Sequence, residues 1–309
     1  MFSREYSVTT KYGYEKNIYS VYVNYAKYIS KLNISIDTQE WRLKHIRGFL
    51  SYIKSKKIKD IEPMDVYDYF RSIENLSVKT KEHRAVCLRL FLNYLYENEY
   101  IKFSGYNVFP KIKCSKEASM PSYYTDKEIK LIVNSVNNKA RNGKRDLAII
   151  LLFAKFGLRP RDVKELEFKN ISWSDNTLRI VQSKTNWINI LPFDNDVRYA
   201  LLDYIKNERP LSDLEYVFLK NSYENYNDHF YYNVINKYIK LSKININSRR
   251  HGPYIFRHSK AISLLKDGNG INTIANILGH STTENAKVYL KLNYNDLKKT
   301  SLEVPIWNR

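Results

Sequence analysis

Five side chains in the second half of the chain are suited to chemistry on a phosphodiester. They are Arg159, Lys184, Arg257, His280 and Tyr289. An arginine guanidinium stays charged and offers a planar fork of donors to phosphate oxygens, and a tyrosine hydroxyl can act as a nucleophile once it loses its proton. Each residue alone carries little weight, because the chain has 51 lysines and arginines and 27 tyrosines, most of which must serve on the surface or in the core.

More weight comes from four short motifs and from their order along the chain. The motifs are Gly157-Leu158-Arg159 with Asp162, Ser183-Lys184-Thr185-Asn186 running into Ile190-Leu191-Pro192, Phe256-Arg257-His258-Ser259, and Leu278-Gly279-His280 with Tyr289 nine positions after the histidine. In this order they resemble the first arginine box, the lysine hairpin, the second arginine box and the histidine and nucleophile box of tyrosine recombinases. That family includes phage integrases and Xer recombinases, and the resemblance covers nearly the whole chain.

The resemblance implies a catalytic role for each of the five residues. Arg159 and Arg257 would stabilise the charge that grows on the nonbridging oxygens of the phosphate. Tyr289 would attack phosphorus and leave a 3′-phosphotyrosine and a free 5′-hydroxyl, with Lys184 protonating the departing oxygen as general acid and His280 donating a hydrogen bond to the phosphate. The phosphodiester energy is kept in the new bond, so no cofactor, ATP or metal is expected, and the sequence shows neither a P-loop nor an acidic metal cluster.

Simpler explanations exist for several residues of these motifs. Asp162, one helical turn beyond Arg159, is expected to pair with Arg159 and fix its pose, but the same spacing fits a surface ion pair of little energetic value. Lys184 also fits an exposed turn lysine, and His280 fits a helix-capping or core histidine. His258 follows the second arginine, as it often does in the family, and is assigned a supporting place in the site.

The second arginine box departs from the family pattern at one position. The family usually has a histidine three residues before the arginine, whereas this chain has Tyr254 three residues before Arg257. A phenol with a pKa of about 10 cannot readily take a proton near neutral pH, so Tyr254 is predicted to donate a hydrogen bond to the phosphate and not to act as the base. His251 would replace the missing histidine only if the Gly252-Pro253 turn folds it back into the site.

Two other functions stay open from the sequence. A type IB topoisomerase uses similar chemistry as a monomer and relaxes DNA, and recombinant product on paired sites would distinguish the two enzymes. A DNA-binding protein with a decayed active site is suggested by Tyr254, and a covalent adduct on a nicked DNA substrate would exclude it. The five residues named first make decay the weaker alternative.

The first third of the chain is expected to form a small helical domain. Apolar residues recur at helical spacing, and no strand alternation interrupts them. Helices are predicted at 19–32, 38–53, 64–73 and 80–96. The basic, proline-containing segment 109–120 is interpreted as a linker, so that residues 1–108 form a first domain whose pattern is similar to the SAM-like core-binding domain of the family.

Residues 121–309 are expected to form an α-rich catalytic domain with a small antiparallel sheet, so the predicted fold class is mainly α. Thr125-Asp126-Lys127-Glu128 has the pattern of a capping box that opens a helix. Two strands, 177–182 and 187–193, flank the turn that carries Lys184. Helices are predicted at 125–136, 145–156, 196–207, 229–242, 256–268, 271–278 and 283–289.

The balance of charge points to a polyanionic partner. The net charge is +19 and the sequence pI is about 9.6, which favours nucleic acid, although a surplus that serves only solubility is the alternative. The resemblance implies double-stranded DNA core sites as the partner. Candidate DNA contacts on two helices of the first domain are Arg42, Lys44, Arg47, Lys79, Lys81 and Arg84. Such groups position a domain on phosphates, and which of them contact bases is not indicated.

Assembly and location are predicted from the ends of the chain and from its composition. In the family, the segment after the nucleophile docks on a neighbouring subunit of a cyclic tetramer, so the partly apolar tail 290–309 is expected to be exchanged within a homotetramer on paired sites. Packing of the tail on its own domain is the alternative. No signal peptide or membrane-spanning run is present and the helical domain starts almost at once, so a cytoplasmic, nucleoid-associated protein without an arm-binding domain is expected.

The two cysteines suggest no special chemistry. Cys87 lies in an apolar helical run and is predicted to be a core residue, whereas Cys114 lies in a lysine-rich stretch and is predicted to be exposed. Neither has metal-ligand spacing, and two cysteines do not make a disulfide framework.

Overall fold

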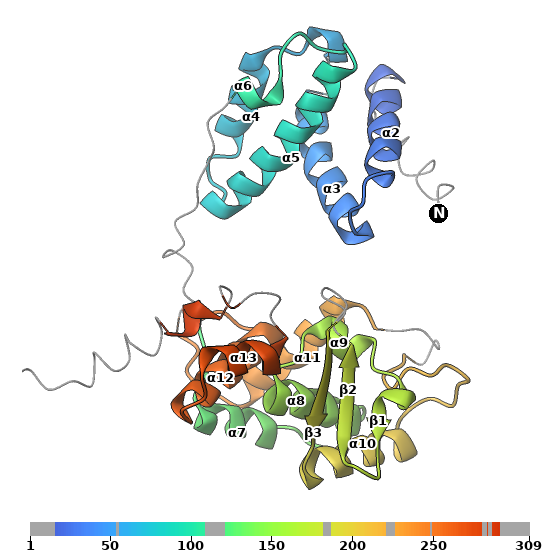
Figure 1. The fold of residues 1–309 in the computed structure, drawn as a ribbon, viewed down its shortest axis with the longest axis vertical. Helices are drawn as coiled ribbons and strands as arrows, with labels where there is room; N and C mark the ends of the chain where they lie inside the picture. The colour runs from blue at the N-terminus through green and yellow to red at the C-terminus, as the bar shows by residue number, and fades with distance from the viewer. Residues whose placement is uncertain are drawn as a thin grey trace, which may run out of the picture. The chain divides into compact units, whose positions relative to one another are not determined.

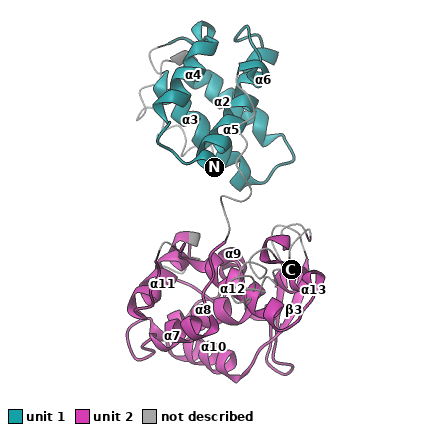
Figure 2. Ribbon diagram, turned by 90° about the vertical axis from the view of Figure 1, so that its left-hand side faces the viewer, with its two compact units in different colours: residues 1–118 teal, residues 119–309 magenta. Residues whose placement is uncertain are grey.

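The computed structural model describes residues 16–53, 56–108, 121–181, 187–220, 226–247, 249–279, 283 and 286–290. The chain divides into two compact units, residues 1–118 and residues 119–309 (Figure 2). The division falls within the segment 109–120 that the sequence predicts as a linker, and that segment lies outside the described residues.

The first unit is built from helices. These are α2 (Lys16–Ser30), α3 (Ile36–Tyr52), the 3-10 helix η1 (Ile58–Asp60), α4 (Pro63–Ser72), α5 (Val78–Glu97) and α6 (Gly105–Val108) (Figure 1). Ser35 and Ser77 cap α3 and α5, since the hydroxyl of each accepts the backbone N–H three residues on, at 3.3 and 3.2 Å. Helices α3 and α5 pack together over a core that includes Ile46, Phe49 and Phe91.

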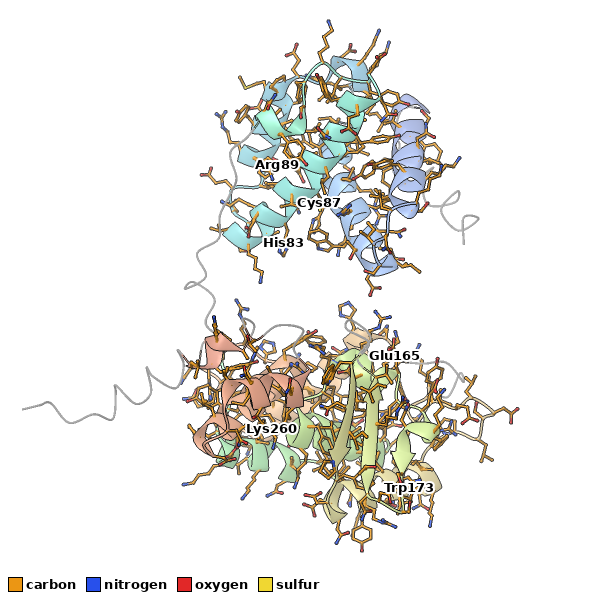
Figure 3. The ribbon with its side chains drawn as sticks, in the orientation of Figure 1. His83, Cys87, Arg89, Glu165, Trp173 and Lys260 are labelled. Carbon is orange, nitrogen blue, oxygen red and sulfur yellow. The ribbon has the colours of Figure 1, made fainter. Side chains whose placement is uncertain are left out.

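Cys87 lies on α5 between His83 and Arg89, the positions labelled in Figure 3. Its side chain is fully buried, so the prediction that Cys87 is a core residue is confirmed. Burial raises the pKa of the Cys87 thiol to about 12, which keeps it protonated and unreactive at neutral pH. Cys114 lies outside the described residues.

The second unit surrounds one buried helix. Its elements are α7 (Asp126–Asn134), α8 (Gly143–Phe156), α9 (Pro160–Lys164), η3 (Phe168–Asn170), β1 (Ile171–Ser172), β2 (Thr177–Val181), β3 (Ile188–Pro192), α10 (Asn195–Asn207), α11 (Asp228–Leu241), α12 (Pro253–Lys266) and α13 (Ile271–Leu278) (Figure 1). Every residue from Ala148 to Phe153 on α8 is buried, as expected for a helix that is apolar on all sides. Helices α7, α10, α11 and α12 pack around it.

The sheet is a three-stranded antiparallel meander in the order β1-β2-β3. Leu178 lies opposite both Ile171 and Leu191, and these three side chains are buried on one face. The side chain of Asn189 on β3 donates to the carbonyl oxygen of Ile277 at 2.6 Å, which joins the sheet to the end of α13.

The predicted fold class, mainly α with a small antiparallel sheet, is confirmed. Several details differ from the sequence analysis: α6 and the two 3-10 helices were not predicted, and the ends of several helices are shifted. Strand β1 was not predicted, because two residues are too few to show an alternating pattern. Helix α12 begins at Pro253 and not at Phe256, because a proline suits the first position of a helix, where its missing N–H has no intrahelical partner. This earlier start places Tyr254 in the first turn of α12.

Candidate active site

The first arginine box is a turn between two helices. Helix α8 ends at Gly157, whose φ of 62° is in the left-handed region that favours glycine. Arg159 then caps α9, which begins with Pro160. The carboxylate of Asp162 accepts the backbone N–H of Arg159 at 3.0 Å, which fixes the start of α9. The pairing of Asp162 with the Arg159 guanidinium stays a prediction.

The second arginine is buried against this turn. Arg257 on α12 has 4% of its surface exposed, and its guanidinium donates to the carbonyl oxygen of Gly157 at 3.1 Å and to that of Leu278. Burial, and then the nearby Arg159, lower the pKa of Arg257 to about 10, so the group stays charged at neutral pH. Because the guanidinium is buried, the local dielectric is low and its charge interacts strongly with an incoming anion.

Both arginines are anchored on the end of α13. The guanidinium of Arg159 donates to the carbonyl oxygen of Gly279 at 3.1 Å, and that of Arg257 donates to the preceding carbonyl, that of Leu278. The last carbonyls of a helix have no partner within the helix and carry partial negative charge, so they suit cationic groups. These hydrogen bonds orient two positive side chains from different motifs around the same helix end.

Tyr289 lies in the same part of the unit. Its side chain is 2% exposed and packs in an apolar cluster with Ile262, Ile274 and Leu278 of α12 and α13. Its hydroxyl oxygen lies 3.1 Å from Nδ1 of His258. Burial raises the pKa of the Tyr289 phenol, and the charges of Arg257 and Arg159 oppose that rise. The two arginines therefore stabilise the phenolate form that a nucleophile requires.

Beside these groups, Asp162 is buried and His258 is half-buried. Burial, then Arg257, then Arg250, lower the pKa of His258 to about 4, so its imidazole is neutral at pH 7. Burial raises the pKa of the Asp162 carboxyl, and the backbone hydrogen bond from Arg159 and the charges of Arg159 and Arg257 act in the opposite direction. Two guanidiniums beside one carboxyl and a neutral imidazole give the site a net positive charge at neutral pH.

Tyr254 lies in the first turn of α12, where its side chain faces solvent. Its side chain is 46% exposed, and the centre of its ring lies 6.4 Å from that of Tyr232. The turn before it requires glycine, because Gly252 has a φ of 106° and a Cβ at that position would lie 2.7 Å from the Tyr232 ring. His251 is exposed.

Lys184 and His280, which the sequence places in the site, lie outside the described residues. The structure therefore brings together Arg159, Arg257, Asp162, His258 and Tyr289 from motifs up to 130 positions apart in the sequence. The contact between His258 and Tyr289 was not predicted. Its only sequence signal is the place of His258 directly after the second arginine.

The candidate DNA-contacting residues of the first unit differ in solvent exposure and in their hydrogen-bond partners. Lys44 and Lys79 are exposed, whereas Arg42 and Arg47 are half-buried. Lys81 donates to the backbone carbonyl of Glu74 at 3.3 Å. The guanidinium of Arg84 donates to the Tyr69 hydroxyl at 2.9 Å, so Arg84 has a partner inside its own unit.

Comparison with known proteins decides the family. Residues 122–296 match the profile of the Phage integrase family, which is more than half of the chain. The chain belongs to the phage integrase family. It is 30% identical over 187 residues to integrase/recombinase y4gC of Sinorhizobium fredii, a match that covers 60% of this chain and 97% of that protein.

Further relatives and solved structures agree with this membership. This chain is 25% identical over 254 residues to a tyrosine recombinase of Thermosipho africanus, and the match covers 80% of this chain and 86% of that protein. Its fold matches the XerH recombinase bound to difH DNA with a TM-score of 0.71 at 15% identity, covering 86% and 80% of the two chains. It matches a lambda integrase dimer on a core site with a TM-score of 0.69 at 16% identity, covering 93% and 99%.

The predicted enzyme class is confirmed at the level of the family. The chain is a tyrosine-type site-specific recombinase, and neither the topoisomerase nor the decayed-protein alternative is favoured. Within the described ranges, no helix is long and apolar enough to cross a membrane.

Proposed function

We propose that this recombinase cleaves and rejoins DNA through a covalent bond between Tyr289 and the 3′ side of the scissile phosphate. The observation that supports this most directly is the convergence of a buried tyrosine hydroxyl with two guanidiniums held on adjacent carbonyls of α13. Two fixed positive charges beside an oxygen nucleophile are suited to a reaction in which negative charge grows on a phosphate.

The proposed roles follow from the chemistry of each group. Arg159 and Arg257 bind the nonbridging oxygens, and Asp162 holds the backbone at Arg159. As the Tyr289 oxygen bonds to phosphorus, the bond from phosphorus to the 5′-oxygen breaks, and Lys184 gives that oxygen its proton. His280 donates a hydrogen bond to the phosphate, and Tyr254 donates one from the first turn of α12. Attack by a 5′-hydroxyl reverses the steps and releases Tyr289, so the scheme uses no cofactor, ATP or metal.

Double-stranded DNA carrying core sites is the proposed partner. The net charge of +19 supports binding to phosphates, and the exposed Lys44 and Lys79 are the candidate contacts of the first unit that are best placed to reach them. Solved structures of similar fold include XerH on difH DNA and lambda integrase on a core site. Such a protein would act in the cytoplasm, in association with the nucleoid.

A cyclic homotetramer that forms a Holliday junction is the proposed working assembly. A lambda integrase tetramer bound to a Holliday junction has a similar fold, with a TM-score of 0.67 at 16% identity. In this proposal the tail 290–309, which is largely outside the described residues, docks on the neighbouring subunit and closes the ring.

A plasmid carrying two copies of a bound site tests the proposed function. Sites are first recovered from host DNA as covalently attached fragments. Incubation of the two-site plasmid with the recombinase should then give deletion or inversion products and junction intermediates. Relaxation of the supercoiled plasmid without any exchanged product would contradict the proposal and favour the topoisomerase alternative.

A further inference from the structure

The nucleophile and a histidine meet in the folded chain. Nδ1 of His258 lies 3.1 Å from the Tyr289 hydroxyl oxygen, within hydrogen-bond distance, and the centres of the two rings lie 5.8 Å apart. His258 sits on α12 directly after Arg257, so the helix that supplies one arginine of the site also places an imidazole on the oxygen that must lose its proton.

Tyr254, which occupies the position of the usual family histidine, does not offer an alternative acceptor. Its side chain is 46% exposed, and the centre of its ring lies 6.4 Å from that of Tyr232. His251, the other histidine of this segment, is exposed. Among the described histidines, His258 is the one for which the structure gives a contact with the nucleophile.

We infer that His258 takes the proton of the Tyr289 hydroxyl as the phenol oxygen attacks phosphorus, an inference that rests on the proposed function. The lone pair on Nδ1 accepts the proton, which requires the neutral tautomer with its hydrogen on Nε2. The bond from the Tyr289 oxygen to phosphorus forms while the bond from phosphorus to the 5′-oxygen breaks, and that oxygen takes its proton from Lys184. In rejoining, His258 returns the proton to the departing phenolate.

Burial and the charges around His258 determine the pKa of its imidazole, and so whether Nδ1 can accept a proton. Burial, Arg257 on the same helix and Arg250 before it disfavour the imidazolium, with a pKa of about 4, so Nδ1 is unprotonated at neutral pH. Arg257 and Arg159 also act on Tyr289 and favour the phenolate. A bound phosphodiester brings a negative charge beside these guanidiniums and offsets their repulsion of an imidazolium. His258 therefore becomes a better base when DNA is present.

Substitution of His258 separates proton transfer from packing. His258→Asn keeps a polar group near the position of Nδ1 but cannot carry the proton away. His229→Gln, at an exposed position near the start of α11, is the matched control. Cleavage is measured as covalent adduct on a nicked suicide substrate, with DNA affinity measured in parallel. We expect the His258→Asn cleavage rate to fall by roughly 10²–10⁴-fold at pH 7, with affinity and the control unchanged.

Two further measurements distinguish a lost base from a packing defect: the cleavage rate as a function of pH, and the cleavage rate on a substrate with a different leaving group. The deficit of His258→Asn should shrink as pH rises, because hydroxide then removes the phenol proton. A substrate with sulfur in place of the bridging 5′-oxygen has a leaving group that needs no proton, so it should rescue Lys184→Ala and leave His258→Asn slow. Rescue of His258→Asn by sulfur, or a deficit that does not change with pH, would overturn the inference.

The pH dependence of wild-type cleavage tests the role of His258 even if His258→Asn does not fold. Its cleavage rate should fall as pH drops toward the pKa of His258 in the DNA complex, and a rate that stays flat down to pH 4 would overturn the role. Wild-type adduct formation with an unaffected His258→Asn rate would overturn the inference alone. Absence of any adduct from the wild-type chain would overturn the proposed function and the inference with it.

Discussion

Gly157 and Arg257 are in direct contact across 100 positions of sequence. The Arg257 guanidinium donates to the Gly157 carbonyl oxygen at 3.1 Å, and a Cβ added to Gly157 would lie 3.1 Å from the Arg257 Cα. The turn that ends α8 and the helix that carries the second arginine therefore touch through backbone and side chain together. A side chain at Gly157 would push on the group that is proposed to bind the phosphate.

Gly157→Ala should destabilise the protein and slow DNA cleavage. The φ of 62° alone disfavours alanine by about 1–2 kcal/mol, and the close approach to Arg257 adds to that. Gly268→Ala is the matched control, because Gly268 has a φ of 82° but nothing within 4 Å of an added Cβ. Urea unfolding should show a larger loss for Gly157→Ala than for Gly268→Ala. Equal losses would show that the contact with Arg257 carries no weight.

Tyr254→Phe should reduce cleavage without reducing stability. The hydroxyl is proposed to donate to the phosphate, and a hydrogen bond to a charged group contributes about 1.5–3 kcal/mol, or roughly 10–100-fold in rate. The side chain is 46% exposed, so its removal should leave the thermal midpoint nearly unchanged. Adduct formation is timed for Tyr254→Phe and Tyr254→His, and the histidine variant should retain cleavage or cleave faster. A wild-type cleavage rate in Tyr254→Phe would show that the Tyr254 hydroxyl has no part in the reaction.

Glu128 should make stability depend on pH near 4. Its carboxylate accepts from Arg249 at 2.5 and 3.1 Å and from the backbone N–H of Thr125 at 2.8 Å, and the hydrogen bond from Arg249 is the main reason that the pKa of Glu128 is lowered. A lowered folded-state pKa means that this stabilisation is present above the unfolded value of about 4.3 and is lost as pH falls through the folded value.

Glu128→Gln should therefore lower stability at pH 7 by about 1 kcal/mol, the usual effect of losing a helix cap. The difference from wild type should shrink as pH falls below about 4.3 and disappear only below the lowered folded-state pKa of Glu128, where the wild-type carboxyl is also neutral. Urea unfolding from pH 7 to pH 3.5 measures this, with Asp126→Asn on the same helix turn as a control of smaller effect. A difference that is constant across this range would be inconsistent with the carboxylate as its cause.

Lys44 and Lys79 should contribute to DNA affinity through phosphate contacts. Each contact that is lost should reduce the slope of log affinity against log salt by about 0.9. Lys44→Gln with Lys79→Gln should weaken binding to all sequences alike, and Lys102→Gln, at an exposed position elsewhere in the first unit, should not. Affinity is measured by fluorescence anisotropy at several salt concentrations. An unchanged slope in the double variant would place the DNA on another surface.

Local rules in the sequence predicted the helices, the hairpin strands and one helix cap. The capping box of Thr125 and Glu128 forms as expected, because its hydrogen bonds join residues only three positions apart. Proline stands at the first position of both α9 and α12, and the rule that favours it there was not applied at Pro253, so the predicted start of α12 was too late. Patterns of this kind need no knowledge of the tertiary fold.

The supports of the site could not be predicted in the same way. The carbonyls of Leu278 and Gly279 accept from the arginines only because the end of α13 packs beside α12 and the start of α9. The approach of His258 to Tyr289 depends on the same packing, and no spacing rule specifies it. Motif order predicted which residues react, whereas the carbonyls that hold the two arginines are backbone atoms with no sequence signature.

The most direct measurement is the identity of the residue that becomes attached to DNA. A nicked suicide substrate traps the covalent intermediate, and mass spectrometry of its peptide locates the attachment. We predict DNA on Tyr289, no adduct with Tyr289→Phe despite normal DNA binding, and normal adduct with Tyr294→Phe. An adduct that survives in Tyr289→Phe, or a peptide in which another tyrosine carries the DNA, would contradict the account.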